Sequence, residues 1–235
     1  NFKIPEKYKK SAIAIGNFDG IHLGHQKVFK ETKKFAMTEK IKFGVLTFNP
    51  LPLMFFNKNI KNFRLTSEEQ KLKIFKKSKV DFVINIKFNK KFSNIKAEEF
   101  IKKIICKKIN AQLLAVSNNF KFGKNRKGDV SLLKKFSNQE DYFLLKIKPF
   151  NYLGKIVSST KIRNLLKKGD ITLVNKLLSR TWSIEGKVIV GNKIGRKLGY
   201  RTCNIDVKNY ILPRLGIYAV KISISNIILR LWLKR

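Results

Sequence analysis

The sequence predicts an α/β fold in which a doubly wound parallel sheet forms the N-terminal part and a partial β-barrel module follows it. From residue 11 to about residue 147, short apolar runs rich in Ile, Val, Phe and Leu alternate with amphipathic stretches. This alternation is typical of buried parallel strands joined by helices. From about residue 180, short β-type runs follow one another across turns with Gly or Pro, which favours a barrel or sandwich.

Five apolar runs in the first part are predicted to be strands buried on both faces, because they are short and almost free of charge. They comprise residues 12–15, 43–48, 80–86, 113–116 and 142–147. In the second part the predicted strands comprise residues 183–190, 202–207 and 217–224. The change of pattern near residue 180 divides the chain into two predicted domains, residues 1–179 and residues 180–235.

Two amphipathic segments between the strands are predicted to be helices. Residues 66–69, Thr-Ser-Glu-Glu, form a capping box that opens a helix with Leu72 and Phe75 among its apolar positions. Residues 97–109 place their apolar side chains on one face and lysines on the other. The apolar side chains of that face are Phe100, Ile101, Ile104, Ile105 and Ile109.

Two more helices are predicted between the two parts of the chain, at residues 159–168 and 171–178. Gly169 and Asp170 separate them. Glycine favours the C-terminus of a helix and aspartate caps the N-terminus of the next one, so the division is predicted at these two residues.

The chain is strongly basic, with 52 Lys and Arg against 15 Asp and Glu and a formal net charge of +37. Such a charge attracts nucleic acid. However, the excess is mostly lysine, runs through the whole chain and accompanies abundant Asn, Ile and Phe. We interpret it as the compositional drift of an A/T-rich coding sequence, and expect weak binding at low salt but no specific nucleic-acid partner.

Other features of the composition bound the cellular context. No apolar run reaches the length of a membrane span, and the N-terminal residues lack the apolar region of a signal peptide. Cys106 and Cys203 make neither a disulfide framework nor a zinc site. We therefore expect no membrane partner and a cytoplasmic location.

Both histidines lie in one segment, Gly-Asn-Phe-Asp-Gly-Ile-His-Leu-Gly-His at residues 16–25, directly after a predicted strand. His22 and His25 share one face of a helix that begins there. Free backbone N–H groups at a helix start suit phosphate, and two imidazoles can donate hydrogen bonds to phosphate oxygens during displacement at phosphorus. The competing interpretations are a capping turn with two incidental histidines and half of a metal site. No third histidine exists and the strand–turn–helix context fits, so we predict His22 and His25 to be catalytic. The predicted nucleotide-binding residues of the segment are Gly16, Asn17, Phe18, Asp19, Gly20 and Gly24.

A second segment places three hydroxyl side chains, Ser158, Ser159 and Thr160, before a predicted helix that carries Arg163 one turn in. Hydroxyls, helix N–H groups and a fixed guanidinium together make a clamp for a triphosphate or a leaving pyrophosphate. Taken alone, the segment is better explained by an N-cap and an exposed arginine. Beside the histidine segment we predict the three hydroxyls to bind nucleotide and Arg163 to be catalytic.

Two further segments are candidates for ligand binding. Residues 118–124 follow a predicted strand, and loops at strand C-termini bind ligands in open α/β sheets. Their predicted binding residues, whose aromatic rings could stack a planar ligand or pack in the core, are Asn119, Phe120, Phe122 and Gly123. Residues 191–204 have spaced glycines and basic residues suited to phosphate or to a plain β-turn, with Thr202 and Asn204 as predicted oxygen ligands of Mg²⁺.

In this order, the four segments resemble the bacterial bifunctional riboflavin kinase/FAD synthetase family over nearly the whole chain. Residues 16–25 match its Gly-x-Phe-Asp-Gly-x-His-x-Gly-His pattern, and residues 158–163 match Ser-Ser-Thr-x-Ile-Arg. The resemblance implies a sheet of the nucleotidyltransferase type. It implies that the first domain joins ATP and FMN into FAD, releasing pyrophosphate with Mg²⁺, and that the second phosphorylates riboflavin to FMN.

The sequence departs from the family pattern at several points. Asn119 stands where the family usually has Asp, and Leu51 where many relatives have a polar residue. The family continues beyond the strand at residues 216–220 to a catalytic glutamate, whereas here no glutamate follows Glu185. From this departure we predict a truncated kinase module without activity. Two alternatives stay open, namely another HxGH-type nucleotidyltransferase with a different acceptor and a degenerate basic nucleic-acid-binding protein.

Overall fold

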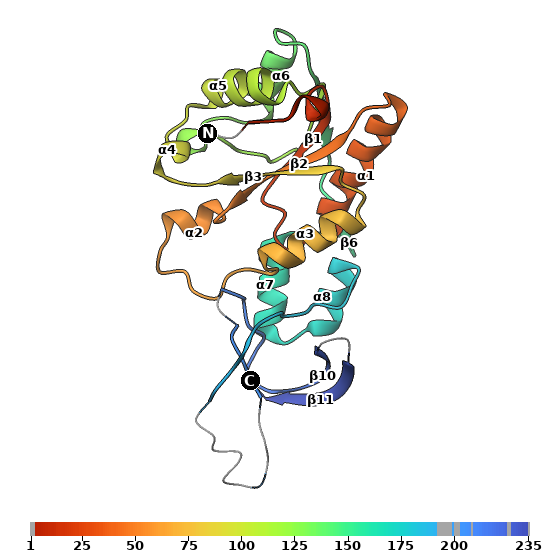
Figure 1. Cartoon of the computed structure of the whole chain (residues 1–235), viewed down its shortest axis with the longest axis vertical. Helices are drawn as coiled ribbons and strands as arrows, with labels where there is room; N and C mark the ends of the chain where they lie inside the picture. Colours follow the sequence, from red (N-terminus) through yellow and green to blue (C-terminus); the bar gives the residue numbers. More distant parts are fainter. Residues whose placement is uncertain (1–2, 192–198, 200–202, 208, 225–226, 235) are drawn as a thin grey trace.

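The computed structural model describes residues 3–191, 199, 203–207, 209–224 and 227–234. At its centre lies a five-stranded sheet in which every neighbouring pair is parallel, in the order β3-β2-β1-β4-β5 (Figure 1). The strands are β1 (Ala12–Ile15), β2 (Phe43–Asn49), β3 (Phe82–Lys87), β4 (Leu113–Ser117) and β5 (Phe143–Ile147). These bounds confirm the five predicted strands to within two residues.

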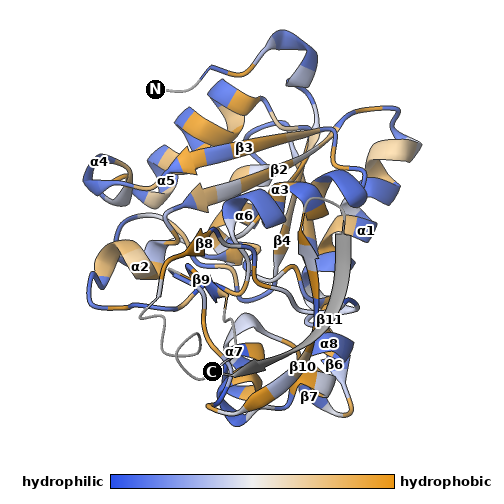
Figure 2. Cartoon of the chain, turned by 60° about the horizontal axis from the view of Figure 1, so that its bottom comes forward, coloured by the Kyte–Doolittle hydropathy of each residue, from blue (hydrophilic) through white to orange (hydrophobic). Residues whose placement is uncertain are grey.

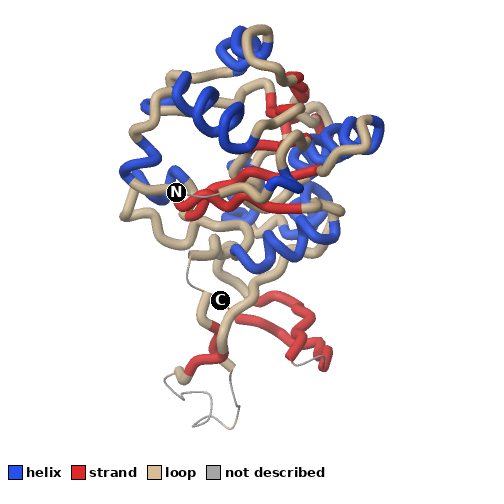
Figure 3. The backbone as a smooth tube through the Cα atoms, turned by 45° about the horizontal axis from the view of Figure 1, so that its top comes forward, coloured by secondary structure: helices blue, strands red, loops and turns tan. Residues whose placement is uncertain are grey.

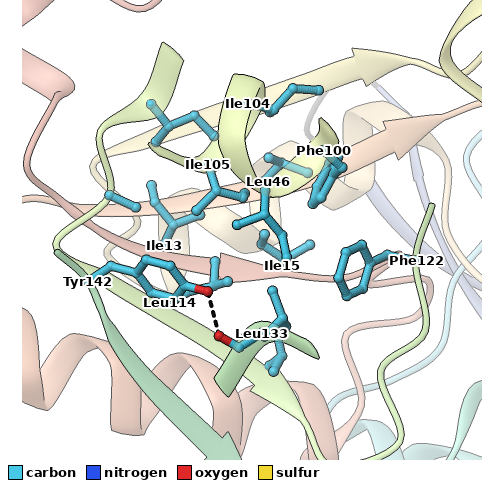
Figure 4. Packing of buried hydrophobic residues seen from close by; sticks show 14 of the residues in the cluster. Ile13, Ile15, Leu46, Phe100, Ile104, Ile105, Leu114, Phe122, Leu133 and Tyr142 are labelled. Atoms are coloured by element: carbon cyan, nitrogen blue, oxygen red, sulfur yellow. Dashed lines mark hydrogen bonds between the residues drawn. The ribbon is translucent and has the colours of Figure 1, made fainter. Parts of the chain in front are cut away.

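Helices pack on both faces of the sheet, as a doubly wound fold requires. One face packs against α5 (Ala97–Glu99), its π-helical continuation η2 (Phe100–Ile109) and α6 (Val130–Ser137), whereas α1 (Leu23–Thr38) and α3 (Glu68–Lys77) pack on the other. The side chains of a strand alternate between the two faces. Figure 4 shows Ile13 and Ile15 of β1 directed toward η2, while Ala12 and Ala14 pack against α1.

The packing of these layers follows the predicted apolar faces. All five predicted apolar side chains of residues 97–109 are buried. Within the same cluster the Tyr142 hydroxyl donates a hydrogen bond of 2.6 Å to the carbonyl oxygen of Leu133 (Figure 4), so this buried polar group is satisfied. Figure 2 shows the hydrophobic residues of the strands enclosed by helices with hydrophilic outer surfaces, such as α3.

The helix α3 begins one residue later than the sequence predicted. Ser67 is its N-cap and forms a capping box with Gln70, whereas the prediction paired Thr66 with Glu69. The reason is that the Thr66 hydroxyl is engaged elsewhere, where it accepts a hydrogen bond from the backbone N–H of Gly20. Of the two apolar positions named for this helix, Phe75 is buried, whereas Leu72 is 46% exposed.

The two helices between the parts of the chain match the prediction. They are α7 (Ser159–Lys168) and α8 (Ile171–Leu178). Gly169 ends α7 in the left-handed conformation at φ 84°, and the Asp170 side chain accepts a hydrogen bond from the N–H of Leu173 at the start of α8. The shorter elements are η1 (Glu6–Tyr8), α2 (Pro52–Phe56), α4 (Lys90–Ser93), η3 (Lys124–Arg126), β6 (Asn151–Tyr152) and β7 (Lys155–Ile156).

The C-terminal part contains two antiparallel strand pairs. One joins β8 (Val188–Ile189) to β9 (Asn204–Ile205), and the other joins β10 (Ile217–Ile224) to β11 (Ile227–Lys234). Figures 1 and 3 show the second pair on the side of α7 and α8 that faces away from the sheet. The strand predicted at 217–224 is confirmed.

The other two strands predicted in this part are much shorter than expected, since β8 and β9 cover two residues each. The missing length of the first has a physical cause. Gln70 of α3 donates to the carbonyl oxygen of Ser183, and the N–H of Glu185 donates to the Tyr210 hydroxyl. These side chains therefore bind backbone groups that would otherwise pair with a neighbouring strand. No helix in the described part of the chain is long and apolar enough to cross a membrane.

Candidate active site

The candidate active site lies where the strand order of the sheet reverses. The strand β1 lies between β2 and β4, so the loops that follow β1 and β4 diverge, and a crevice at such a switch point binds ligands in open α/β sheets. A cavity of about 1200 Å³ occupies this place. Predicted site residues from three separate segments line it, namely Gly16, Asn17, Phe18, Asp19, His25, Asn119, Phe120, Phe122, Gly123, Ser159, Thr160 and Arg163.

The charge of the cavity is positive. Its basic lining residues are Lys61, Lys121, Arg126, Arg163 and Lys167, and Asp19 is the acidic residue among those described there. Low-dielectric walls that carry charge of one sign concentrate ligands of the opposite sign. A polyanion such as a triphosphate therefore suits this cavity.

The two histidines stack on each other at the start of α1. Their ring centroids lie 3.7 Å apart at an interplanar angle of 20°. His25 lines the cavity, whereas His22, the N-cap residue of α1, is 5% exposed. Within the described residues, neither Nδ1 atom has a hydrogen-bond partner. Buried polar atoms are normally paired, so the pair retains hydrogen-bonding capacity.

Burial sets the protonation state of both imidazoles. It lowers the pKa of His22 to about 4, and the nearby guanidinium groups of Arg163 and Arg180 add to the effect. The pKa of His25 is lowered well below its usual value, mainly by burial and then by His22 and the same two arginines. Both imidazoles are therefore neutral near pH 7, and each carries one N–H donor.

The turn before the histidines is held by packing and by an unusual backbone. The Phe18 ring is 2% exposed and packs edge-on to His25 and against Phe29, so it supports the imidazole from behind while its edge lines the cavity. Gly20 has φ 81°, and a Cβ there would lie 2.7 Å from the Leu65 side chain. Gly20 is therefore required by backbone conformation and packing.

Asp19 and Arg163 form a buried ion pair across the cavity wall. The Arg163 Nη2 atom donates to Asp19 Oδ2 at 2.5 Å. The backbone N–H of Leu65 donates to the same carboxylate at 3.0 Å. Burial raises the pKa of Asp19, whereas Arg163 and the backbone N–H groups of Leu65 and Thr66 lower it. The carboxylate fixes the guanidinium at the cavity.

The hydroxyl segment connects α7 to the histidine turn. Ser158 caps α7 by accepting from the N–H of Lys161. The Ser159 hydroxyl donates to the carbonyl oxygen of Asp19 at 2.9 Å, and Thr160 is exposed toward the cavity. Ser158 thus shapes the helix start, and Ser159 and Thr160 reach the cavity together with Arg163.

The loop after β4 forms the opposite wall. Asn119 is exposed and accepts a hydrogen bond from the Ser117 hydroxyl at 2.8 Å. The rings of Phe120 and Phe122 are stacked with centroids 5.4 Å apart, and Phe122 also packs on Phe100 of the core. One ring therefore belongs mainly to the core, and Phe120 is the more available of the two.

Some predicted site residues do not line the cavity. Gly20, His22, Gly24 and Ser158 lie behind its wall, in the turn and the helix starts that shape it. Asn204 is exposed on β9 and is not among the residues that line the cavity, and Thr202 lies outside the described residues.

Sequence reasoning missed two residues that hold this site. The Phe63 ring lies under Arg163, with 3.7 Å between the guanidinium carbon and the ring centroid, and the Phe63 carbonyl oxygen accepts from Arg163 Nε. Arg180 donates to the backbone carbonyl oxygens of Gly20 and Ile21. Neither residue belongs to a local pattern, because Phe63 binds a residue 100 positions away in the sequence and Arg180 binds one 159 positions away.

Comparison with known proteins agrees with this geometry. The FAD synthetase family model matches residues 4–161, and the riboflavin kinase family model matches residues 178–232. A solved structure described as a macrolide-efflux protein from Streptococcus pneumoniae has a TM-score of 0.83 and 26% identity, covering 96% of this chain and 74% of its own. The predicted loss of the kinase module is not supported, because the riboflavin kinase family model matches residues 178–232.

The descriptions of the curated relatives name both activities. The bifunctional riboflavin kinase/FMN adenylyltransferase of Buchnera aphidicola subsp. Schizaphis graminum is 44% identical over 91% of this chain and 69% of its own length. The proteins of the same description from Haemophilus influenzae and Escherichia coli K12 are 34% and 31% identical, covering 92% and 89% of this chain and 70% and 67% of their own lengths. The chain therefore belongs to the bifunctional riboflavin kinase/FMN adenylyltransferase family.

Proposed function

We propose that this chain makes FAD by transferring the AMP moiety of ATP to FMN with release of pyrophosphate. The observation that carries the proposal is the convergence of the histidine turn, the Arg163 helix and the loop after β4 on one basic cavity. A phosphate oxygen of FMN forms a bond to the α-phosphorus of ATP while the bond from that phosphorus to the bridging oxygen of the leaving pyrophosphate breaks. No oxidant or further reactant is needed.

His25 donates a hydrogen bond to the α-phosphate as negative charge builds up on its oxygens. We assign the proton of its neutral ring to Nε2, because Nδ1 is buried and has no hydrogen-bond partner within the described residues. The His22 ring stacks on the His25 ring and supports it from the side away from the cavity. A preorganised donor aimed at developing charge is among the strongest contributions to catalysis.

Arg163 binds the pyrophosphate side of the triphosphate, because Asp19 and Phe63 hold its guanidinium at the cavity wall. The Thr160 hydroxyl and the start of α7 add donors for phosphate, while the Ser159 hydroxyl ties α7 to the histidine turn through the Asp19 carbonyl oxygen. Mg²⁺ is usually held in part by substrate phosphates, so we propose that it enters bound to ATP, where it neutralises phosphate charge. Asn119, Phe120 and Gly123 form the wall against the flavin, and the backbone of Gly16 to Asp19 faces the nucleotide.

The direct test is incubation of the purified chain with FMN, ATP and Mg²⁺, with FAD measured by chromatography. We expect FAD and pyrophosphate in equal amounts. Parallel reactions offer CTP in place of ATP, and 4′-phosphopantetheine in place of FMN. Turnover of one of these with no FAD formation would establish another nucleotidyltransferase and overturn the proposal.

Riboflavin phosphorylation is a second candidate function, favoured by the riboflavin kinase match over residues 178–232. We propose that the module around β8 to β11 serves this activity, with Thr202 and Asn204 as oxygen ligands of Mg²⁺. Incubation with riboflavin and ATP should yield FMN, and then FAD by the first activity. Conversion of FMN but not of riboflavin would contradict this second proposal alone.

A further inference from the structure

The histidine turn adopts a backbone conformation that side chains disfavour. Phe18 has φ 48°, Gly20 has φ 81° and Ile21 has φ 40°. Left-handed backbone is unusual for any residue with a Cβ, and most of all for a β-branched one such as Ile21. Such a turn persists only where surrounding contacts over-determine it.

Those contacts come from Arg180, in the segment that follows α8, and from Gln26 of α1. Arg180 Nη2 donates to the Gly20 carbonyl oxygen at 2.6 Å, and its Nη1 donates to the carbonyl oxygens of Ile21 at 3.3 Å and Leu178 at 3.2 Å. Gln26 of α1 donates to the Ile21 and Leu178 carbonyl oxygens, each at 3.0 Å. One guanidinium and one amide therefore bind the two peptide groups that directly precede His22.

The two side chains differ in charge. Gln26 is neutral, whereas Arg180 stays protonated near pH 7, since burial lowers its pKa only to about 10. Within the described residues, Asp19 pairs with Arg163, and no carboxylate pairs with Arg180. The charged or titratable groups that act on the histidines are Arg163 on α7, Arg180 after α8, and the partner imidazole on α1. Asp19, on the same turn, faces Arg163.

We propose that Arg180 is a positioning residue for adenylyl transfer, which fixes the backbone of the histidine turn and keeps a positive charge beside His22 and His25. This inference rests on the proposed function, because it assigns Arg180 to that reaction. An arginine at the end of α8 could serve only as a helix C-cap through the Leu178 carbonyl oxygen. Its two bonds to Gly20 and Ile21 go beyond a cap, because they reach a turn 159 and 160 residues away.

The charge role is tested by titrating the histidine ring protons by NMR, which requires no substrate. The chain has only two histidines, so both signals can be followed. In Arg180→Gln we expect both titration midpoints to rise toward 6.5, the ordinary value. In Gln26→Ala, which removes bonds to the Ile21 and Leu178 carbonyl oxygens without removing charge, the midpoints should stay. Lys176→Gln, at an exposed position of α8, is the control for loss of a distant charge.

The positioning role is tested by steady-state kinetics of FAD formation. We expect Arg180→Gln to lower kcat by roughly 10- to 100-fold, because a misplacement of catalytic groups by about 1 Å can cost up to about 100-fold, with the KM for ATP nearly unchanged. Arg180→Lys keeps the charge but loses the planar fork. Its midpoints should match the wild type while its kcat falls, and circular dichroism melting checks that each variant is folded.

Midpoints that do not move in a folded Arg180→Gln variant, or a kcat equal to that of Lys176→Gln, would overturn the assignment. The failure of the proposed function is distinct. If the wild type made no FAD while the histidine midpoints still rose in Arg180→Gln, the adenylyl-transfer role would fail, and the influence of Arg180 on the histidine turn would stand.

Discussion

Asp19 and Arg163, 144 residues apart in the chain, form an ion pair in which the two side chains are 4% and 11% exposed. The pair joins the histidine turn after β1 to the first turns of α7. The Leu65 and Thr66 backbone N–H groups bind the same carboxylate, so three distant segments meet at one group. The walls of the cavity are therefore fixed before any ligand binds.

Breaking this pair should strongly destabilise the fold. Asp19→Asn removes the negative charge and leaves the Arg163 guanidinium buried without its partner, which typically costs about 3–5 kcal/mol. Urea denaturation measures the free energy of unfolding. The matched control is Glu185→Gln, whose ion pair with Lys73 is 46% and 64% exposed and should contribute less than about 1 kcal/mol. Equal losses in the two variants would contradict the account.

Acid should destabilise the protein through His22. The unfolded chain titrates near 6.5 and the folded one at about 4, so the unfolded state binds more protons between these values and stability falls as pH falls through that window. The shift corresponds to about 3 kcal/mol between pH 7 and pH 4. Urea unfolding of the wild type and His22→Asn across this window measures it. The variant should lose less stability, and parallel pH profiles would show the prediction wrong.

Replacing Gly123 should destabilise the fold more than its left-handed backbone conformation alone explains, because a side chain there has no room. Gly123 and Gly154 have similar φ values, 72° and 71°, but a Cβ on Gly123 would lie 2.7 Å from the backbone of Ala97, whereas Gly154 has nothing within 4 Å. Gly154→Ala should cost about 1–2 kcal/mol for the left-handed conformation. Gly123→Ala should cost roughly 1–3 kcal/mol more. Thermal melts compare them, and equal costs would mean that the loop moves aside.

The net charge should produce only nonspecific binding to nucleic acid. Binding through phosphates weakens steeply with salt, and 6–10 such contacts lose about 10³–10⁵ in affinity between 50 and 200 mM salt. Fluorescence anisotropy with a labelled RNA and a DNA duplex measures this dependence. We expect binding to disappear near physiological salt. Tight binding that persists there would favour the nucleic-acid-binding alternative.

The sheet and its helices could be predicted because their signals are local. Residues 12–15 and 113–116 are apolar runs that need burial on both faces, and Gly169 and Asp170 end one helix and start the next by their own chemistry. The start of α3 was misplaced by one residue because two hydroxyls stand side by side. The choice between them depends on Gly20, which is 46 residues away from Thr66.

The candidate site was predicted only in part for the same reason. The histidine segment, the hydroxyl segment and the loop after β4 have recognisable patterns, and the topology of the sheet brings them together. The contacts of Asp19 with Arg163 and of Arg180 with Ile21 connect residues far apart in the chain. No spacing or periodicity encodes such pairs, so the supporting residues emerge only from the folded structure.

The most direct test of the central claim uses ATP labelled in its α-phosphate and compares the wild type with His25→Ala. If the chain transfers AMP to FMN, the label should appear in FAD when FMN is present, and His25→Ala should lower the rate by about 10²–10³-fold, as expected for the loss of one preorganised donor. FAD formation by His25→Ala at the wild-type rate, or no labelled FAD from the wild type at saturating FMN, would contradict the claim.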